Sequence, residues 1–232
     1  MQFYNRSFLT AQQAQVYDFL LRSMGQPRIP CTGQPTDVNA AIKALLMDHP
    51  QICYFEGKWQ LDNGMILPLY VLHPVAAADV QAAADSICHA FPHEDYPKQV
   101  YLWMLNCIRY DPAAPNSQNA YGALVQHSAV CKGIAKAYQL LMRLRQIPCI
   151  LVEGTLDGVM KHVWNMVYLD GQWLHVDVTM GYPQFWSFTG ASDAFGGYLR
   201  TTEEITRSHR IFHSERLPVN RDGGEKNESE NV

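Results

Sequence analysis

Apolar residues recur at helical spacing through most of the first half of the chain. Residues 11–24 place their apolar side chains on one face, and Thr10 stands where a helix cap is needed. The same spacing predicts helices over residues 38–47, 75–91 and 98–108. Residues 52–72 instead have strand character on both sides of Asn63-Gly64, which predicts a β-hairpin.

The second half begins with a helix of unusually broad apolar surface and then changes to strands. From Cys131 onward, apolar residues fill two neighbouring helix faces, which predicts a central, largely buried helix. The pattern then predicts strands over residues 147–152, 163–169 and 173–178, with a tight Asp170-Gly171 turn between the last two. Because helices come first and strands later, the order favours an α+β fold over alternating βαβ units.

Composition and charge fit a folded protein with no overall attraction to polyanions. Of the 232 residues, 47% are hydrophobic and 17% are charged, and the formal net charge is −4. This charge disfavours nucleic acids and anionic membrane surfaces as partners. The most apolar stretch, residues 65–78, is too short for a membrane helix, and the start of the chain lacks the apolar run of a secretory signal. We therefore expect a soluble, cytoplasmic protein whose six well-separated cysteines are reduced.

Cys131 stands where a loop turns into the predicted central helix. Free backbone N–H groups and the positive end of the helix dipole favour a thiolate at such a position. Lys132 and Lys136 add positive charge, and Gly133 leaves room for a substrate or a neighbouring strand to approach the thiol. A single cysteine is more often a small apolar core residue, so this position alone does not identify a nucleophile.

The hairpin that follows supplies the partners that a nucleophilic thiol needs. Its two-residue turn predicts a register that pairs His162 with Thr179 and Trp164 with Asp177. His162 and Asp177 then share one face as diagonal neighbours, so that the carboxylate can orient the imidazole. If the other ring nitrogen faces Cys131, the three residues fill the roles that activated-thiol acyl transfer requires.

His175 competes with His162 for the role of the base. It lies on the Asp177 face in the same register, and spacing alone leaves both histidines open. A single buried histidine is commonly a hydrogen-bonded core residue. Trp164 is interpreted as core, with shielding of the His and Asp from water as the alternative.

Three sequence motifs lie at and after the start of the predicted central helix. They read Val-Cys-Lys-Gly-Ile-Ala at residues 130–135, His-Val-Trp-Asn at 162–165 and Trp-Leu-His-Val-Asp-Val-Thr at 173–179. Over about residues 121–180 the chain thereby resembles the transglutaminase-like superfamily, most closely its bacterial transglutaminase/protease-like branch. The resemblance implies a papain-like core in which a helix that begins at a cysteine packs on an antiparallel sheet.

The resemblance also assigns catalytic roles to three residues. It implies that Cys131 is the nucleophile, His162 the base and Asp177 the orienting acid, and it favours His162 over His175. The chain departs from the usual family pattern at residues 134, 174 and 180, which bears on substrate preference rather than on the chemistry.

The remaining polar clusters give weaker predictions. An oxyanion needs a second donor beside the backbone N–H of Cys131, and Gln126 and Tyr121 are the candidates. His89, His93, Glu94 and Asp95 suggest metal ligands, but a proline breaks the helix between the two histidines, so a solvated turn explains them better. We expect no metal and no organic cofactor, and the chain has no clustered acidic loop for calcium.

The chain divides by composition into three parts. Residues 1–92 form an accessory region of helices and a β-hairpin, residues 93–216 the catalytic core, and residues 217–232 a disordered polar tail. The expected function is acyl transfer from a glutamine side chain or a peptide bond of a protein or peptide substrate, through a Cys131 thioester, to an amine or water. The alternatives are a cysteine peptidase or amidase, and a non-catalytic interaction module that keeps the fold. The sequence does not predict the oligomeric state.

Overall fold

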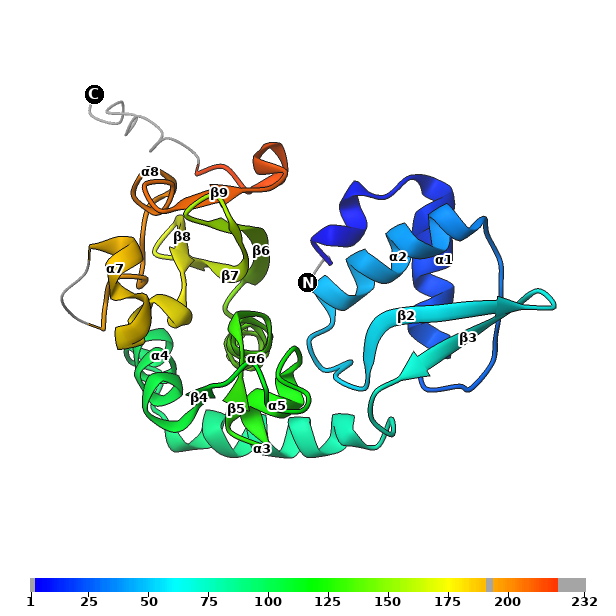
Figure 1. The fold of residues 1–232 in the computed structure, drawn as a ribbon, viewed down its shortest axis with the longest axis horizontal. Helices are drawn as coiled ribbons and strands as arrows, with labels where there is room; N and C mark the ends of the chain where they lie inside the picture. Colours follow the sequence, from blue (N-terminus) through cyan, green and yellow to red (C-terminus); the bar gives the residue numbers. More distant parts are fainter. Residues whose placement is uncertain (1–2, 191–193, 221–232) are drawn as a thin grey trace, which may run out of the picture.

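The computed structural model describes residues 3–190 and 194–220. Figure 1 shows an N-terminal region beside a core built around one central helix, α6 (Cys131–Leu144). The N-terminal region consists of a short 3₁₀ helix, two α-helices and a three-stranded antiparallel sheet of order β1-β3-β2. Its elements are η1 (Asn5–Phe8), α1 (Ala11–Ser23), β1 (Ile29–Pro30), α2 (Pro35–Asp48), β2 (Phe55–Asp62) and β3 (Met65–Tyr70).

Two local sequence signals in this region are confirmed. The Thr10 side chain accepts a hydrogen bond from the backbone N–H of Gln13 (3.3 Å), and the Gln13 side-chain oxygen accepts one from the backbone N–H of Thr10 (3.2 Å), so α1 begins with a capping box. Asn63 and Gly64 both have positive φ, at 48° and 75°, as a tight hairpin turn between β2 and β3 requires.

The core surrounds α6 with helices on one side and a sheet on the other (Figure 1). The four-stranded antiparallel sheet has the order β8-β7-β6-β9. The Asp170-Gly171 hairpin joins β7 to β8, as the sequence predicts. The larger elements are α3 (Ala76–Ala90), α4 (Tyr96–Cys107), α5 (Ala120–Leu124), β6 (Cys149–Leu156), β7 (Met160–Leu169), β8 (Gln172–Val176) and β9 (His209–Ile211). The shorter ones are β4 (Arg109–Tyr110), β5 (Ser128–Ala129), η2 (Val178–Gly181), η3 (Pro183–Phe185), α7 (Trp186–Thr189), α8 (Thr202–Ile205) and η4 (Ser214–Arg216).

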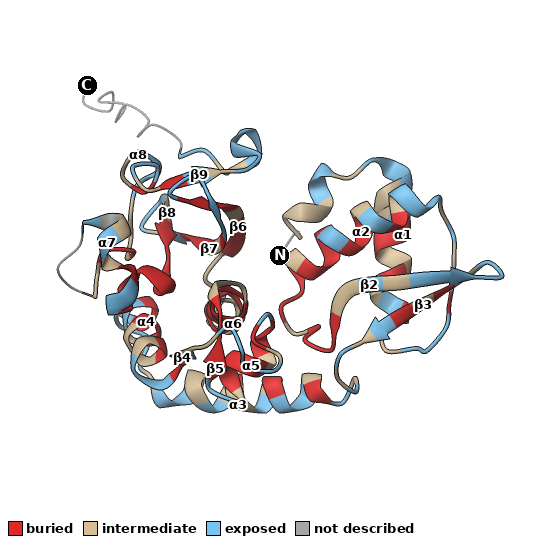
Figure 2. Ribbon diagram, in the orientation of Figure 1, coloured by how far each residue is buried: buried red, intermediate tan, exposed pale blue. Residues whose placement is uncertain are grey.

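Burial explains the broad apolar surface of α6. Ten of its 14 residues are buried. In Figure 2, many of the buried residues of the core lie on α6 and on the strands beside it. An α+β core with its cysteine helix packed on an antiparallel sheet is therefore confirmed. Among the described residues, no helix is long and apolar enough to cross a membrane, and all six cysteines are free thiols.

The N-terminal region is tied to the core by buried polar contacts as well as by apolar packing. Asp48 is fully buried, and its carboxylate accepts a hydrogen bond from the Tyr17 hydroxyl (3.1 Å). Its backbone carbonyl accepts one from the Arg143 guanidinium at the end of α6. Gln139 of α6 donates to the carbonyl of Met47 (3.1 Å). The bonds from Arg143 and Gln139 hold the C-terminal end of α2 against the central helix.

The junction between the two parts and the C-terminal tail differ in detail from the sequence-based division. Helix α3 packs on α5 and α6, so a boundary after residue 92 separates two helices, α3 and α4, that both contact α6. Of the predicted tail, residues 221–232 lie outside the described residues, whereas the Asn220 side chain is hydrogen-bonded to the backbone of Trp173 in β8.

Candidate active site

Cys131 is the first residue of α6, and no side chain caps this end of the helix. Its thiol is partly exposed and borders a cleft of about 580 Å³, which His162 also lines. Gly133 lets the loop before α5 lie against the first turn of α6, because a Cβ at this position would collide with the carbonyl oxygen of Ser117. The space beside the thiol that the sequence suggested is therefore used by a neighbouring loop.

A buried histidine–aspartate pair adjoins this cleft, because His162 is one of the residues that line it. His162 Nε2 is 2.6 Å from Asp177 Oδ2, and each side chain is only 1% exposed. Because Nε2 donates to the carboxylate, Nδ1 is the ring nitrogen that remains for exchange of a proton with Cys131. The structure thus brings together the three residues that the sequence selected.

The route by which Asp177 reaches His162 differs from the predicted register. Five pairs between β7 and β8 follow the prediction, from Leu169 opposite Gln172 to Asn165 opposite Val176. The strand ends there, so the predicted pairs at Asp177 and Thr179 do not form. Asp177 instead caps η2, with its Oδ1 accepting the backbone N–H of Thr179 at 3.0 Å. This turn points the other carboxylate oxygen at the imidazole.

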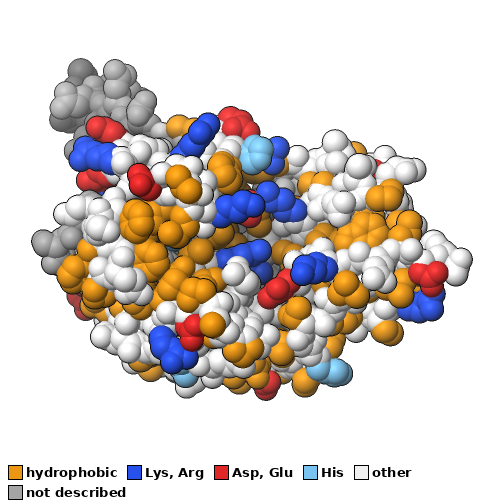
Figure 3. Space-filling view, viewed as in Figure 1, with side chains coloured by type: hydrophobic (Ala, Val, Ile, Leu, Met, Phe, Trp, Pro, Cys, Tyr) orange, Lys and Arg blue, Asp and Glu red, His pale blue; other side chains and the backbone are white. Residues whose placement is uncertain are grey.

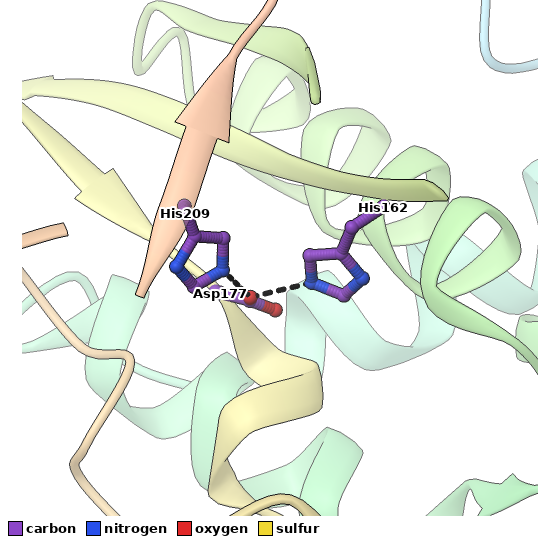
Figure 4. A group of neighbouring side chains, drawn as sticks. All are labelled: His162, Asp177 and His209. Carbon is purple, nitrogen blue, oxygen red and sulfur yellow. Dashed lines mark hydrogen bonds and ion pairs between the residues drawn. The ribbon is translucent and has the colours of Figure 1, made fainter. Parts of the chain in front are cut away.

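A second histidine, His209, completes the site, and sequence reasoning missed it. Its Nε2 lies 3.0 Å from the same Oδ2 of Asp177, and its Nδ1 lies 2.8 Å from the hydroxyl of Ser208. Figure 4 shows the carboxylate of Asp177 between the two imidazoles, which come from β7 and β9. The three-residue strand β9 pairs with the edge of β6 and has no apolar alternation in the sequence to reveal it.

The pair is arranged to keep opposite charges on its two members. Burial alone would lower the pKa of His162, but the Asp177 carboxylate outweighs burial and, with a smaller effect of Cys131, raises the pKa to about 10. Burial would likewise raise the pKa of Asp177, but His162 and His209 together hold it below its usual range. The buried pair therefore places a positively charged imidazole and a negatively charged carboxylate close to Cys131.

These shifts fix how the pair contributes to stability across the pH range. His162 binds its proton more tightly in the folded chain, so its contribution is complete below about pH 6.5 and is lost as the pH rises towards 10. Asp177 is the opposite case, because its contribution is present above about pH 4 and is lost on acidification. The pair therefore stabilises the fold most in the weakly acidic range.

His175 does not face the cleft. It is fully buried, its Nδ1 accepts a hydrogen bond from Trp164 Nε1 (2.9 Å), and its Nε2 lies 3.2 Å from the Thr202 hydroxyl. Burial, aided by His209, lowers its pKa to about 4, so it is neutral and structural. The Trp164 ring stacks on His162 at 5.8 Å between centroids and is 1% exposed, so it is at once core and a shield for the pair.

The cleft has other donors than the ones predicted. Gln126 is exposed, its Oε1 accepts from Asn116 (3.3 Å), and neither Gln126 nor Tyr121 lines the cleft. Gln118 and Tyr110 do line it. Burial raises the pKa of Tyr110 to about 12, with Cys131 close enough to contribute, so its hydroxyl stays protonated and can donate.

Clusters of histidine and carboxylate side chains are the groups that could hold a metal ion. Within residues 3–190 and 194–220, the three side chains of Figure 4 are the one group that offers a cation three closely spaced ligand atoms. Both histidine nitrogens that face Asp177 already bond to it, so the group is satisfied without a metal. His89 instead bonds to the Asp85 carbonyl (2.6 Å) and His93 to Arg145 (2.6 Å).

A helix that begins at a cysteine, packed on an antiparallel sheet that carries a buried histidine–aspartate pair, defines a papain-like α+β core. Residues 81–178 match the family model described as the Transglutaminase-like superfamily, from within α3 to the start of η2. The match covers less than half of the chain, and over these residues the chain is similar to that superfamily.

Individual relatives are distant. Over 117 residues the chain is 26% identical to kyphoscoliosis peptidase of Homo sapiens and 24% identical to that of Mus musculus. Each alignment covers 44% of this chain and 18% of the relative, so the chain spans less than a fifth of the length of these relatives. Among solved structures, a TGase is 16% identical with a TM-score of 0.37 over 53% of this chain and 43% of that one. A protein of Cytophaga hutchinsonii is 22% identical with a TM-score of 0.39 over 46% and 39%.

The geometry predicts that His162, and not His175, activates the thiol. Iodoacetamide labelling of Cys131, read by peptide mass spectrometry, should remain fast at pH 6 in the unchanged protein and in His175→Gln. In His162→Ala the rate at pH 6 should fall at least tenfold, because the thiol then ionises as an ordinary one, whereas the difference should shrink near pH 9.5. A loss of low-pH labelling in His175→Gln alone would reverse the assignment.

Proposed function

We propose that this chain is a cysteine enzyme that transfers the acyl group of an amide through a Cys131 thioester. The observation that carries the proposal is the buried 2.6 Å bond between His162 and Asp177, whose histidine lines the same cleft as Cys131. A structural ion pair has no need of an adjacent partly exposed thiol at a helix start. The match to the Transglutaminase-like superfamily over residues 81–178 supports the same chemistry.

The first half of the reaction follows from the charges of the site. The Cys131 thiolate attacks the amide carbonyl, and the carbonyl oxygen becomes an oxyanion beside the start of α6, where backbone N–H groups and the helix dipole stabilise it. His162 then gives the proton on Nδ1 to the leaving nitrogen, the C–N bond breaks and a thioester remains. Asp177 keeps the imidazole oriented while its charge changes.

The acceptor determines the product of the second half. Neutral His162 removes a proton from an amine or from water, this nucleophile attacks the thioester, and Cys131 leaves as the thiolate. An amine gives transamidation and water gives hydrolysis. The similarity to mammalian kyphoscoliosis peptidase supports hydrolysis of a peptide bond, and the TGase among the structural neighbours is a reason to test both.

Product analysis distinguishes these outcomes. A glutamine peptide such as benzyloxycarbonyl-Gln-Gly, incubated with hydroxylamine, should yield ammonia and a hydroxamate if an amine is accepted, whereas unfolded casein should yield new peptide termini if water is. Either product should disappear in Cys131→Ala and persist in Cys107→Ser, which removes an exposed thiol outside the cleft. If neither product forms although Cys131 is labelled fast, the enzyme has a narrower substrate. If neither product forms and Cys131 is labelled slowly, the chain is an interaction module.

The second oxyanion donor is assigned to Gln118, in place of Gln126, because Gln118 lines the cleft. With a substrate from the product screen, Gln118→Ala should lower kcat roughly 100-fold, since a lost oxyanion donor acts mainly on the transition state. Gln126→Ala, whose side chain bonds to Asn116 away from the cleft, should leave kcat unchanged. Equal effects of the two substitutions would remove Gln118 from the mechanism.

A further inference from the structure

A second cavity opens beside the catalytic cleft, where the N-terminal region meets the core. It has a volume of about 290 Å³ and shares Lys43, Lys132, Glu153 and Val163 with the wall of the cleft. Lys132 directly follows the nucleophile in sequence, so a substrate held at Cys131 can reach this cavity with a neighbouring group. In Figure 3, Lys and Arg side chains gather near the middle of the face, over the same junction.

The charges in this cavity do not cancel. Lys43 and Glu153 neutralise one another in an ion pair of 2.8 Å. Lys132 and Lys136 remain against a single carboxylate, that of Glu56, which accepts a hydrogen bond from Asn119 (3.3 Å). Neither lysine forms an ion pair or a hydrogen bond through its side chain with any residue in the described ranges. The cavity therefore carries an excess of positive charge.

Lys136 is the unusual member of the set. It is only 2% exposed, and burial together with the nearby Lys132 lowers its pKa to about 8, against smaller opposite effects of Glu56 and Cys53. A lysine this deeply buried is ordinarily paired, because an ammonium group without a partner loses its hydration and gains nothing in return. Apolar neighbours such as Ile42 and Leu151 line the same cavity and offer it no acceptor.

We infer that the cavity binds a carboxylate group of the substrate next to the amide that Cys131 attacks, with Lys136 as its counter-ion and Lys132 at its entrance. The inference rests on the proposed function and gives its substrate class: a peptide or amide with a carboxylate near the reacting bond. The cavity of about 290 Å³ has room for a short acidic chain, because apolar residues such as Ile42 and Leu151 stand beside the lysines. The carboxylate belongs either to an acidic side chain or to the C-terminus of a peptide.

Alkylating probes of matched shape test this substrate class. Chloroacetyl-glutamate α-amide carries a side-chain carboxylate, chloroacetyl-glutamine carries a C-terminal carboxylate, and chloroacetyl-glutamine α-amide is their neutral counterpart. The labelling rate of Cys131 by each probe is divided by the rate at which the same probe labels a small free thiol. After this normalisation, one anionic probe should label Cys131 at least tenfold faster than the neutral probe. The faster anionic probe then identifies the source of the carboxylate. Equal rates for all three probes would overturn the inference.

Two variants decide whether Lys136 is responsible. Lys136→Met keeps the length and the apolar body of the side chain and should abolish the preference for the anionic probe, measured as the ratio of the anionic to the neutral labelling rate within that variant. Lys58→Met removes one exposed charge from β2, outside the cavity, and should preserve the preference. Preference that survives in Lys136→Met contradicts the assignment.

The stability of Lys136→Met gives an internal check on folding. Because the pKa of Lys136 is lowered on folding, its charge destabilises the fold fully below about pH 8, and this cost fades as the pH rises towards 10.5. Lys136→Met should therefore be more stable than the unchanged protein at pH 6 and close to it above pH 10. The groups that face Lys136 and must be considered in such a profile are Lys132, Lys43, Glu56, Glu153 and Cys53.

A binding measurement without chemistry separates this inference from the proposed function. In Cys131→Ser, titration with N-acetyl-glutamate α-amide or N-acetyl-glutamine should raise the NMR-detected pKa of Lys136, while neutral N-acetyl-glutamine α-amide should not. If iodoacetamide labels Cys131 of the unchanged protein slowly while the pKa of Lys136 still responds in this way, the proposed enzymatic function is contradicted and the proposed carboxylate site is supported. If none of the three compounds changes the pKa of Lys136, the proposed carboxylate site is overturned.

Discussion

The structure of the site depends on one buried interaction, the bond between His162 and Asp177. Two groups that prefer opposite charges are held 2.6 Å apart with almost no solvent exposure. Removal of either charge would leave the other buried and uncompensated, which is far more costly than the loss of a surface pair. The surrounding fold is built to satisfy this pair: η2 supplies a backbone N–H, β9 supplies His209 and Trp164 covers the ring.

That environment links distant parts of the chain to Cys131, the proposed nucleophile. His162 belongs to β7, Asp177 caps η2 directly after β8, His209 belongs to β9 at the opposite edge of the sheet, and Cys131 begins the central helix. A displacement of any one of these elements would disturb the site, because the charge on the His162 imidazole depends on the Asp177 carboxylate. The N-terminal region adds a second electrostatic feature, since α2 and β2 close the cavity that contains Lys136.

Sequence reasoning could predict the site as far as local signals extend. The Asp170-Gly171 turn fixes a register that holds for five pairs, and the motif resemblance selects His162 over His175. Sequence reasoning failed where tertiary packing determines the structure. Strand β8 ends at Val176 because Asp177 turns away to cap η2, and no hydrophobic periodicity predicts this turn. Strand β9 has only three residues and therefore no hydrophobic alternation that could predict it. Gln118 lies in an irregular loop whose path is set by packing against Gly133, so no local signal places it at the cleft.

The central claim is that Asp177 keeps the imidazole of His162 protonated in the resting protein. Nitrogen-15 NMR of histidine-labelled protein measures this directly, with Asp177→Asn and His162→Gln used to assign the signals. The account predicts an imidazolium with two protonated nitrogens from pH 5 to beyond pH 8 at His162, beside a neutral ring at His175. A His162 ring that loses its proton near pH 6.5, as an unperturbed histidine does, would contradict it.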